Sequence, residues 1–264
     1  MKDLVTLITG ASKGIGAELA RQMAAKGAKL VLAARNGKEL DEVAAQCKAL
    51  GASVITVKAD VAVEHDCQAM VTEALLAFGR IDVLVNNAGM SMWARFEDIE
   101  DIEVLTRIMQ VNYMGAVYCT RHALPHLRAT GGRIVGVSSL AGRTGVPTRT
   151  GYSASKHAMT GFFDSLRIEL DGSGVTVTMI YPGFVATGIR ENATGPDGKP
   201  ILVSPVKEGE VMSVDECARR ILKAIERRER EVIMSARGRI GLWLKLIAPS
   251  LLDRIAKRAI ERGR

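Results

Sequence analysis

Short runs of apolar, β-rich residues alternate with helical stretches along most of the chain, and few folds can accommodate this alternation. The strand-like runs cover 4–9, 29–34, 53–58, 81–86, 132–138, 175–181 and 230–234. Apolar residues recur at helical spacing in 15–26, 38–50, 65–78, 101–128, 152–170 and 214–228. Most of the strands are apolar throughout, as is typical of a sheet covered on both faces. The pattern predicts a Rossmann-type, doubly wound α/β fold, in which one parallel sheet of about seven strands lies between two layers of helices.

The pattern changes in two places. Residues 188–212 are rich in glycine and proline, which predicts a long loop, and such loops in compact domains are usually functional or disordered. Residues 237–264 carry eight Lys/Arg against two acids, which accounts for +6 of the chain's net charge of +7. The rest is nearly neutral, so the basic charge gives no reason to expect nucleic-acid binding. We expect a single domain over 1–236 that includes the loop, followed by a basic amphipathic extension over 237–264.

A glycine-rich turn follows the first predicted strand and opens the first helix. It reads Thr9-Gly10-Ala11-Ser12-Lys13-Gly14-Ile15-Gly16. Glycines let a backbone turn sharply and approach a pyrophosphate, and a helix N-terminus offers free N–H groups and the positive end of its dipole. The GxxxGxG spacing differs from the commonest dinucleotide fingerprint, and a tight turn without a ligand is the alternative. Its place between strand and helix favours a dinucleotide site.

The residues after the second strand bear on which dinucleotide would fit. An NAD-selective site places a carboxylate there, which binds the ribose hydroxyls of the adenosine half. Here the strand ends in Ala33-Ala34-Arg35-Asn36, and no acid appears before Glu39. Arg35 offers a planar, permanently charged guanidinium to a 2′-phosphate, and Lys13 adds a second cation. Unless both are ordinary solvated surface charges, the site is predicted to take NADP(H).

A second motif, Tyr152-Ser153-Ala154-Ser155-Lys156, opens a predicted helix and places Tyr152 and Lys156 on one face. A free tyrosine has a pKa of about 10 and exchanges protons poorly at neutral pH. A nearby ammonium favours the phenolate and lowers that pKa toward the range that general acid–base catalysis needs. The YxxxK spacing alone is common by chance, so its weight depends on the polar residues around it.

Further polar residues stand where predicted strands end. The carboxyl ends of parallel strands form the ligand crevice of such a sheet, so a hydroxyl or amide there can reach a ligand. The strand ends are followed by Ser138-Ser139, by Asn86-Asn87-Ala88-Gly89, and by Pro182-Gly183 with Thr187 a little further on. Asn112 stands inside a predicted helix among half-buried residues, which favours a polar role over a surface position.

In this order, TGxxxGxG, NNAG, Asn112, Ser139, YxxxK and PG resemble the single-domain branch of the short-chain dehydrogenase/reductase family, over residues 4 to about 235. Residues 149–158 and 162–167 are similar, more loosely, to its hydroxysteroid and lipid-active reductase subgroups. The resemblance implies interconversion of a ketone or aldehyde with an alcohol by means of a nicotinamide cofactor, for which Arg35 and Lys13 predict NADP(H). It also implies a homodimer or homotetramer, joined through the helices at 101–128 and 152–170. The subgroup suggests an apolar substrate of a steroid, lipid or aromatic kind.

The resemblance implies a role for each matched residue. Ser139 and Tyr152 would bind the carbonyl oxygen, and Tyr152 would give the proton in reduction and take it in oxidation. Lys156 would hold the nicotinamide ribose and lower the pKa of Tyr152, while Asn112 would hold a water that links Lys156 to solvent. The residues expected to bind the cofactor are Gly10, Ser12, Lys13, Gly14, Ile15, Gly16, Arg35, Asp60, Val61, Asn87, Ala88, Gly89, Tyr152, Lys156, Pro182, Gly183, Val185 and Thr187.

The extension admits two interpretations. Apolar residues recur in it near helical spacing among arginines and lysines. Such a helix can lie at a membrane interface, where an apolar substrate could enter beneath the 188–212 loop. A helix that packs on the body or on a second subunit would show the same pattern. We find no signal peptide or membrane span, and His122 and His126, which have a spacing that can bind a metal, lack a third ligand nearby in the sequence. We therefore expect a cytoplasmic protein without a metal and with at most a peripheral membrane contact.

Other functions remain open at this stage. A protein that senses NADP(H) without turnover would bind the cofactor but would not need a proton donor. A membrane-docking scaffold would leave the Ser139–Tyr152–Lys156 set unexplained. Epimerases and dehydratases of the same superfamily are typically longer and carry a larger C-terminal substrate domain, which we do not expect here. The complete set of motifs therefore favours an NADP(H)-dependent oxidoreductase.

Overall fold

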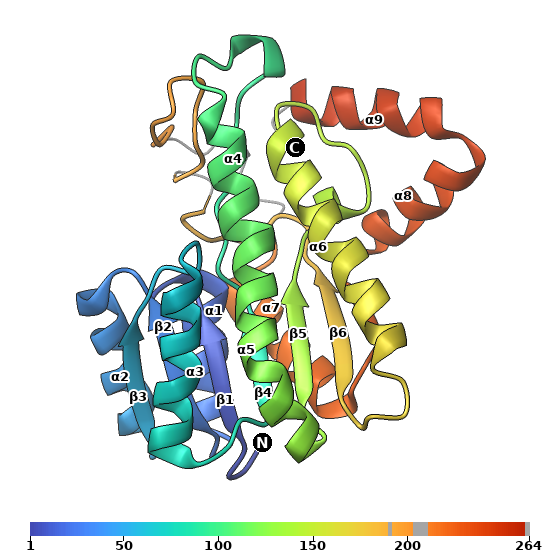
Figure 1. Cartoon of the computed structure of the whole chain (residues 1–264). Coiled ribbons are helices and arrows are strands. Elements are labelled where there is room, and N and C mark those ends of the chain that lie inside the picture. Colours follow the sequence, from blue (N-terminus) through green and yellow to red (C-terminus); the bar gives the residue numbers. More distant parts are fainter. Residues whose placement is uncertain (190–191, 203–210, 262–264) are drawn as a thin grey trace.

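The computed structural model describes residues 1–189, 192–202 and 211–261. These residues form a seven-stranded parallel sheet in the order β3-β2-β1-β4-β5-β6-β7 (Figure 1). The strands are β1 (Val5–Thr9), β2 (Lys29–Ala34), β3 (Val54–Lys58), β4 (Val83–Asn86), β5 (Arg133–Val137), β6 (Thr176–Tyr181) and β7 (Glu231–Ile233). The predicted fold class is confirmed, and the predicted strand and helix ends differ from the observed ones by only one or two residues.

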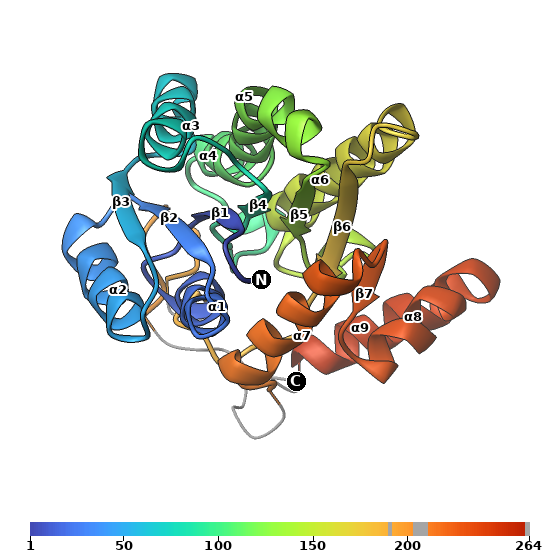
Figure 2. The ribbon, with the colours of Figure 1, turned by 90° about the horizontal axis from the view of Figure 1, so that it is seen from below.

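Helices cover both faces of the sheet, as the view along the strands shows (Figure 2). One face packs against α1 (Gly14–Ala24), α2 (Gly37–Ala49) and α7 (Val214–Arg227). The other packs against α3 (Glu64–Phe78), α5 (Gly115–Thr130) and α6 (Thr150–Glu169). Because both faces are covered, β1 and β4 are buried at every position, which explains why the strands are apolar throughout.

The helix predicted over 101–128 is interrupted. It consists of α4 (Glu103–Met109), a π-helical turn η2 (Gln110–Met114) and α5, in one continuous run. A π turn adds one residue to the helix without changing its course, and such turns are frequent at functional sites. The apolar spacing remains nearly helical across the insertion, so the sequence pattern did not indicate it.

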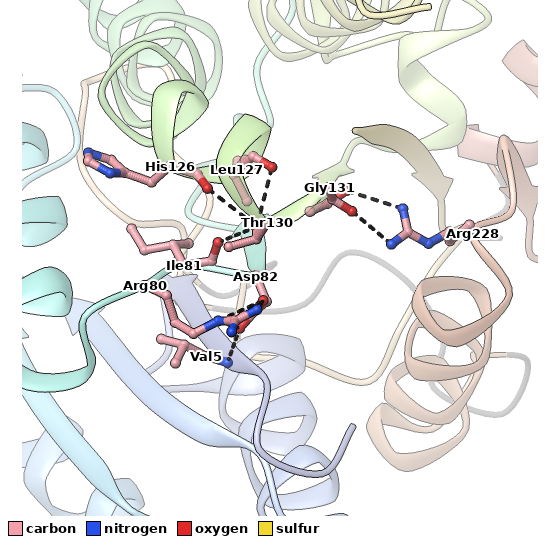
Figure 3. Close-up of polar contacts among 10 residues, drawn as sticks. Val5, Arg80, Ile81, Asp82, His126, Leu127, Thr130, Gly131 and Arg228 are labelled. Carbon is pink, nitrogen blue, oxygen red and sulfur yellow. Dashed lines mark hydrogen bonds and ion pairs between the residues drawn. The ribbon is translucent and has the colours of Figure 1, made fainter. Parts of the chain in front are cut away.

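Polar contacts tie together the amino ends of the strands, on the edge of the sheet opposite the predicted site (Figure 3). The buried carboxylate of Asp82 accepts a hydrogen bond from the Val5 amide at 2.9 Å and forms an ion pair with Arg80. Thr130 donates to the carbonyl of Ile81 at 2.9 Å, and Arg228 donates to the carbonyl of Gly131 at 2.8 Å. These contacts fix the ends of the scaffold and leave the carboxyl edge to the site.

Loops and the last two helices cover the carboxyl edge. In the predicted loop 188–212, residues 190–191 and 203–210 lie outside the described residues, so the expectation there is untested. Thr194 exchanges backbone hydrogen bonds with Ser91 and Trp93, which joins this loop to the segment after β4. After β7 the chain forms α8 (Ala236–Ile247) and α9 (Pro249–Glu261), which project beside α6 (Figure 1).

Candidate active site

One cavity of about 1090 Å³ lies along the carboxyl edge of the sheet. Residues that follow β1, β2, β3, β4, β5 and β6 all contribute to its lining. It passes over the point between β1 and β4 where the strand order reverses, which is where open α/β sheets bind ligands. The predicted site residues all line this cavity except Gly16 and Asn112, which are buried against residues that do.

The glycine loop has a backbone that suits a bound phosphate. Gly10 and Gly14 have φ angles of 65° and 54°, which residues with side chains rarely adopt. A Cβ atom at Gly10 would lie 2.8 Å from the Cα of Ala88, and one at Gly16 would collide with the Gly10 carbonyl. The first turn of α1 has no acidic residue and no side-chain cap, so its N–H groups keep their capacity to bind an anion.

Thr9 and Asn87 hold this loop against the end of β4. The Asn87 side chain donates to the carbonyls of Thr9 and Gly10 at 2.9 and 3.1 Å. The Thr9 hydroxyl accepts from the amides of Asn87 and Ala88, both at 3.1 Å. Thr9 therefore positions the loop, a role that the sequence analysis did not assign to it although it stands in the TG motif.

Two ion pairs lie at the end of the cavity beyond β2 and β3. Lys13 pairs with Glu39 at 2.6 Å, and Arg35 lies 4.0 Å from Asp60. Both cations are largely exposed, and Glu39 lines the cavity with them. Glu39, the first acid after β2, thus stands beside Lys13, because the first turn of α2 places it at the cavity.

Ser139, Tyr152 and Lys156 converge at the other end of the cavity. Burial raises the pKa of Tyr152, while the hydrogen bond with the Ser139 hydroxyl and the charge of Arg149 lower it. Lys156 Nζ donates to the carbonyl of Val137 at 2.9 Å and lies 5.9 Å from the centre of the Tyr152 ring. Burial lowers the pKa of Lys156 to about 8. A hydroxyl pair and a buried cation at one place can bind a carbonyl oxygen and move a proton to it.

Asn112 lies in the π turn and is fully buried. Its side-chain oxygen accepts from the Met90 amide at 2.8 Å, and its nitrogen donates to the Met90 carbonyl and to Ser155 Oγ, both at 2.9 Å. Ser155 in turn donates to the carbonyl of Tyr152 at 2.8 Å. Asn112 therefore connects the segment after β4 to the helical turn that carries the tyrosine.

The cavity lining also includes residues that the sequence analysis missed, among them Arg149 and part of α9. Arg149 lies at the start of α6, buried beside Tyr152, and its spacing of three residues could have indicated this. One side of α9 supplies an apolar wall made of Leu252, Ala256, Ala259 and Ile260. No local signal connects this wall to the site, since only tertiary packing brings the end of the chain to the carboxyl edge.

The other side of the last two helices is open to solvent. Trp243, Leu246 and Ile247 of α8 are 71%, 77% and 79% exposed, and Leu251 and Ile255 of α9 are nearly half exposed. Within the part of the chain that the structure describes, no helix is both long enough and apolar enough to cross a membrane.

Comparisons with known proteins agree with the fold and the motifs. Residues 4–197 match the family model described as short chain dehydrogenase. The 11-beta-hydroxysteroid dehydrogenase-like 4A of Arabidopsis thaliana is 40% identical over 258 residues, which covers 96% of this chain and 84% of that protein. The sequence similarity therefore also covers most of the C-terminal part that lies beyond the family model.

Two solved structures are similar over nearly the whole chain. A short-chain dehydrogenase/reductase from Burkholderia phymatum in complex with NAD has a TM-score of 0.86 and 28% identity, covering 95% of each chain. An alcohol dehydrogenase from the archaeon Thermococcus sibiricus, complexed with 5-hydroxy-NADP, has a TM-score of 0.76 and 26% identity, covering 88% of this chain and 96% of that one. The chain therefore belongs to the short-chain dehydrogenase/reductase family of oxidoreductases, and it is similar to members of that family named hydroxysteroid dehydrogenases.

Proposed function

We propose that this oxidoreductase interconverts a ketone or aldehyde with the corresponding alcohol, using NADP(H) and Tyr152 as the proton-transferring residue. The observation that carries the proposal is the convergence of Ser139, Tyr152 and Lys156 at one end of a cavity whose other end is the glycine loop. The bound cofactor would supply a hydride in reduction and accept one in oxidation, while the protein orients the reactants.

The cavity suits such a cofactor in shape and in the groups that it presents. The uncapped start of α1 and the glycine loop would hold the pyrophosphate. Asp60 and Val61 would lie beside the adenine, and the 87–89 segment would line the cleft. Pro182, Gly183, Val185 and Thr187 would line the nicotinamide end. The volume exceeds the roughly 300–1,000 Å³ that suits one drug-sized ligand, so cofactor and substrate can share it.

The preference for NADP(H) over NAD(H) rests on Arg35 and Lys13. A 2′-phosphate would gain a guanidinium and an ammonium as partners, provided that Lys13 turns from Glu39 toward it. Lys13 is largely exposed, so water weakens the ion pair and the exchange of partners costs little. One similar solved structure contains NAD and another contains 5-hydroxy-NADP, so membership of the family does not decide between the two cofactors. The preference therefore has to come from this chain's own residues.

The proton transfer would take place between Tyr152 and the substrate oxygen. In reduction, the hydroxyls of Ser139 and Tyr152 would donate hydrogen bonds to the carbonyl oxygen, and the phenolic proton would pass to it. In oxidation, the phenolate would take that proton back. Lys156 would favour the phenolate and hold the nicotinamide ribose. Asn112 would serve a water relay through the backbone of its π turn, since its side chain is occupied by Met90 and Ser155.

An apolar substrate fits the substrate end of the cavity. The side chains of Leu140, Val146 and Phe184 line it near the catalytic residues, and the α9 wall adds a further apolar surface. A steroid, a long-chain lipid or an aromatic ketone would bury its surface against these groups. The hydroxysteroid names of similar proteins point to the same class.

The extension over 237–264 would bring such a substrate from a membrane surface. The exposed apolar side of α8 and the net positive charge of this segment together match an interface rich in anionic lipid. Sedimentation with anionic vesicles tests this, with Trp243→Ser as the variant that should lose binding. A homodimer or homotetramer that instead covers α8 would show a change of mass in light scattering on the same substitution.

The function is tested by titration with NADPH and NADH, followed by a screen of apolar ketones and aldehydes for NADPH oxidation. We expect tighter binding of NADPH and turnover of at least one apolar carbonyl compound. Tight NADPH binding without turnover on any compound of the panel would favour the sensing function instead. Tighter binding of NADH would overturn the roles given to Arg35 and Lys13.

A further inference from the structure

Arg149 stands at a helix position where a cation is unfavourable. It is the N-cap residue of α6, and its side chain forms no cap hydrogen bond. Ser, Thr, Asp and Asn are preferred at such positions, and the positive end of the helix dipole disfavours an arginine. The side chain is also only 7% exposed, although a buried guanidinium is costly. Departures of this kind from local preferences are expected where a residue serves the site.

Aromatic rings hold the Arg149 guanidinium in place. Its central carbon lies 4.5 Å from the centre of the Trp93 ring and 5.6 Å from that of Phe184. The same carbon lies 5.7 Å from the centre of the Tyr152 ring. Distances below about 6 Å are those of cation–π contacts, in which the rings attract the cation. The rings of Trp93 and Phe184, which come from two other segments, thus hold a permanent positive charge against the ring of Tyr152.

The backbone before Arg149 is strained. Thr148 has a φ angle of 66°, which is rare for a β-branched residue. Its carbonyl accepts from the Ala94 amide at 2.9 Å, which ties the turn to the segment that carries Trp93. A strained backbone persists where the surrounding structure imposes it. Here the unusual conformation of Thr148 sets the direction of the chain at Arg149, and so helps to orient its side chain.

The charged groups around Tyr152 come from several elements. Lys156 on α6 is the other buried cation, and its ammonium donates to Val137. Among the described residues, the other titratable or charged side chains on the elements with the most contacts to α6 are Glu103 and Arg107 on α4, Tyr113 in η2, Arg133 on β5, Tyr181 on β6 and Arg143 after η3. Of these, Glu103 and Arg107 are exposed, and Arg143 is paired with Glu231 at 3.0 Å. Among the described residues, the buried cations held close to the Tyr152 ring are therefore Arg149, at 5.7 Å from its centre, and Lys156, at 5.9 Å.

We propose that Arg149 is a positioning residue for the proton-transferring tyrosine: its guanidinium, held by Trp93 and Phe184, stabilises the phenolate form of Tyr152. The inference rests on the proposed function, in which Tyr152 cycles between phenol and phenolate. Burial disfavours the phenolate, and the charge of Arg149 opposes this effect. The start of α6 adds the positive end of its dipole, since Tyr152 lies in the first turn. Two cations would then share the task that sequence analysis gave to Lys156 alone.

The test measures the ionisation of residue 152 directly and needs no substrate. Tyr152→difluorotyrosine lowers the phenol pKa into the range where the protein is folded, and fluorine NMR reports the phenolate fraction. This label is placed in the otherwise unchanged chain and in Arg149→Lys and Arg149→Gln. We expect the midpoint of Arg149→Gln to rise by about one pH unit, and that of Arg149→Lys to rise by less than half as much, because the charge remains.

A midpoint in Arg149→Gln that stays within about 0.2 pH units of the unchanged chain would overturn the proposal. So would equal upward shifts in Arg149→Gln and Arg149→Lys, because a structural role alone produces them. If Arg149→Gln does not fold, Trp93→Leu tests the same contact: a raised midpoint supports the proposal, and an unchanged one overturns it. If the midpoint shifts as expected but the protein reduces no carbonyl compound, this inference holds and the proposed function is wrong.

Discussion

The ammonium of Lys156 lies 5.9 Å from the centre of the Tyr152 ring and donates a hydrogen bond to the Val137 carbonyl at 2.9 Å. Lys156 is only 4% exposed, and burial lowers its pKa to about 8, so the side chain is mostly charged at neutral pH. A charge kept in the interior, with the Val137 carbonyl and the weakly accepting Met159 sulfur as its hydrogen-bond partners, costs stability. The cost is understandable if the charge serves the reaction.

Lys156→Met should therefore make the fold more stable while it removes activity. The native pKa of about 8 lies below the ordinary value of 10.5, so below pH 8 both states are protonated and the burial cost is present in full. Between these values the native state releases its proton first, and the stability of the unchanged chain rises with pH. We expect the variant to gain about 2 kcal/mol near neutral pH and less at higher pH. Denaturant unfolding at several pH values measures this.

Lys223→Met is the matched control, because Lys223 is exposed and should leave the free energy of unfolding unchanged. A loss of stability in Lys156→Met, or a gain that does not shrink as the pH rises, would contradict the account of the buried charge.

Glu39→Gln should increase the preference for NADPH. Glu39 holds Lys13 at 2.6 Å, and its removal frees the ammonium for a 2′-phosphate. We expect the dissociation constant of NADH divided by that of NADPH to rise about fivefold at low salt. At high salt the rise should be smaller, because Lys13 is exposed and salt screens its charge. Arg35→Gln should lower the ratio, chiefly through NADPH. Unchanged ratios in both variants would place the 2′-phosphate elsewhere.

Asn112→Ala should destabilise the chain and impair turnover together. The substitution leaves the Met90 amide and carbonyl without their partners and removes a bond to Ser155. We expect a loss of about 2–4 kcal/mol in the free energy of unfolding. Asn112→Asp keeps the acceptor for the Met90 amide but sets a buried carboxylate oxygen against the Met90 carbonyl and Ser155 Oγ, so it should lose at least as much. Equal stability of Asn112→Ala and the unchanged chain would show that these bonds contribute little.

Leu252→Asp and Leu251→Asp form a matched pair on α9. Leu252 lines the cavity, whereas its neighbour points outward and is 42% exposed. A carboxylate at position 252 should raise KM for an apolar carbonyl compound by about tenfold or more, because burying the substrate against a charge is unfavourable. The neighbouring substitution should leave KM unchanged. If both variants behave alike, α9 does not contribute to the substrate site.

The sequence predicted the scaffold well for a physical reason. The central strands of a doubly wound sheet are buried on both faces, so runs such as Val83–Asn86 are recognisable without knowledge of their neighbours. The glycine loop and the Tyr152–Lys156 spacing are equally local. They were visible because a tight turn and one helical face each lie within a few consecutive residues.

The missing parts depend on contacts between distant segments. The ion pair of Lys13 with Glu39 joins the glycine loop to α2, and Leu252 reaches the cavity from the far end of the chain. Arg149 combines both cases: its spacing from Tyr152 is local, but the rings of Trp93 and Phe184 that hold it are not. The π turn at Asn112 leaves the apolar spacing nearly unchanged, so no sequence signal marked it.

The central claim is that Tyr152 transfers the proton. Its most direct test compares the rate of NADPH oxidation, with a carbonyl compound that the unchanged chain reduces, in that chain and in Tyr152→Phe. Both proteins are first shown to bind NADPH equally well. The account predicts a loss of about a thousandfold in kcat for Tyr152→Phe, because the phenylalanine ring fills the same space without a proton to give. A rate within tenfold of the unchanged chain would contradict it, and another group would then have to supply the proton.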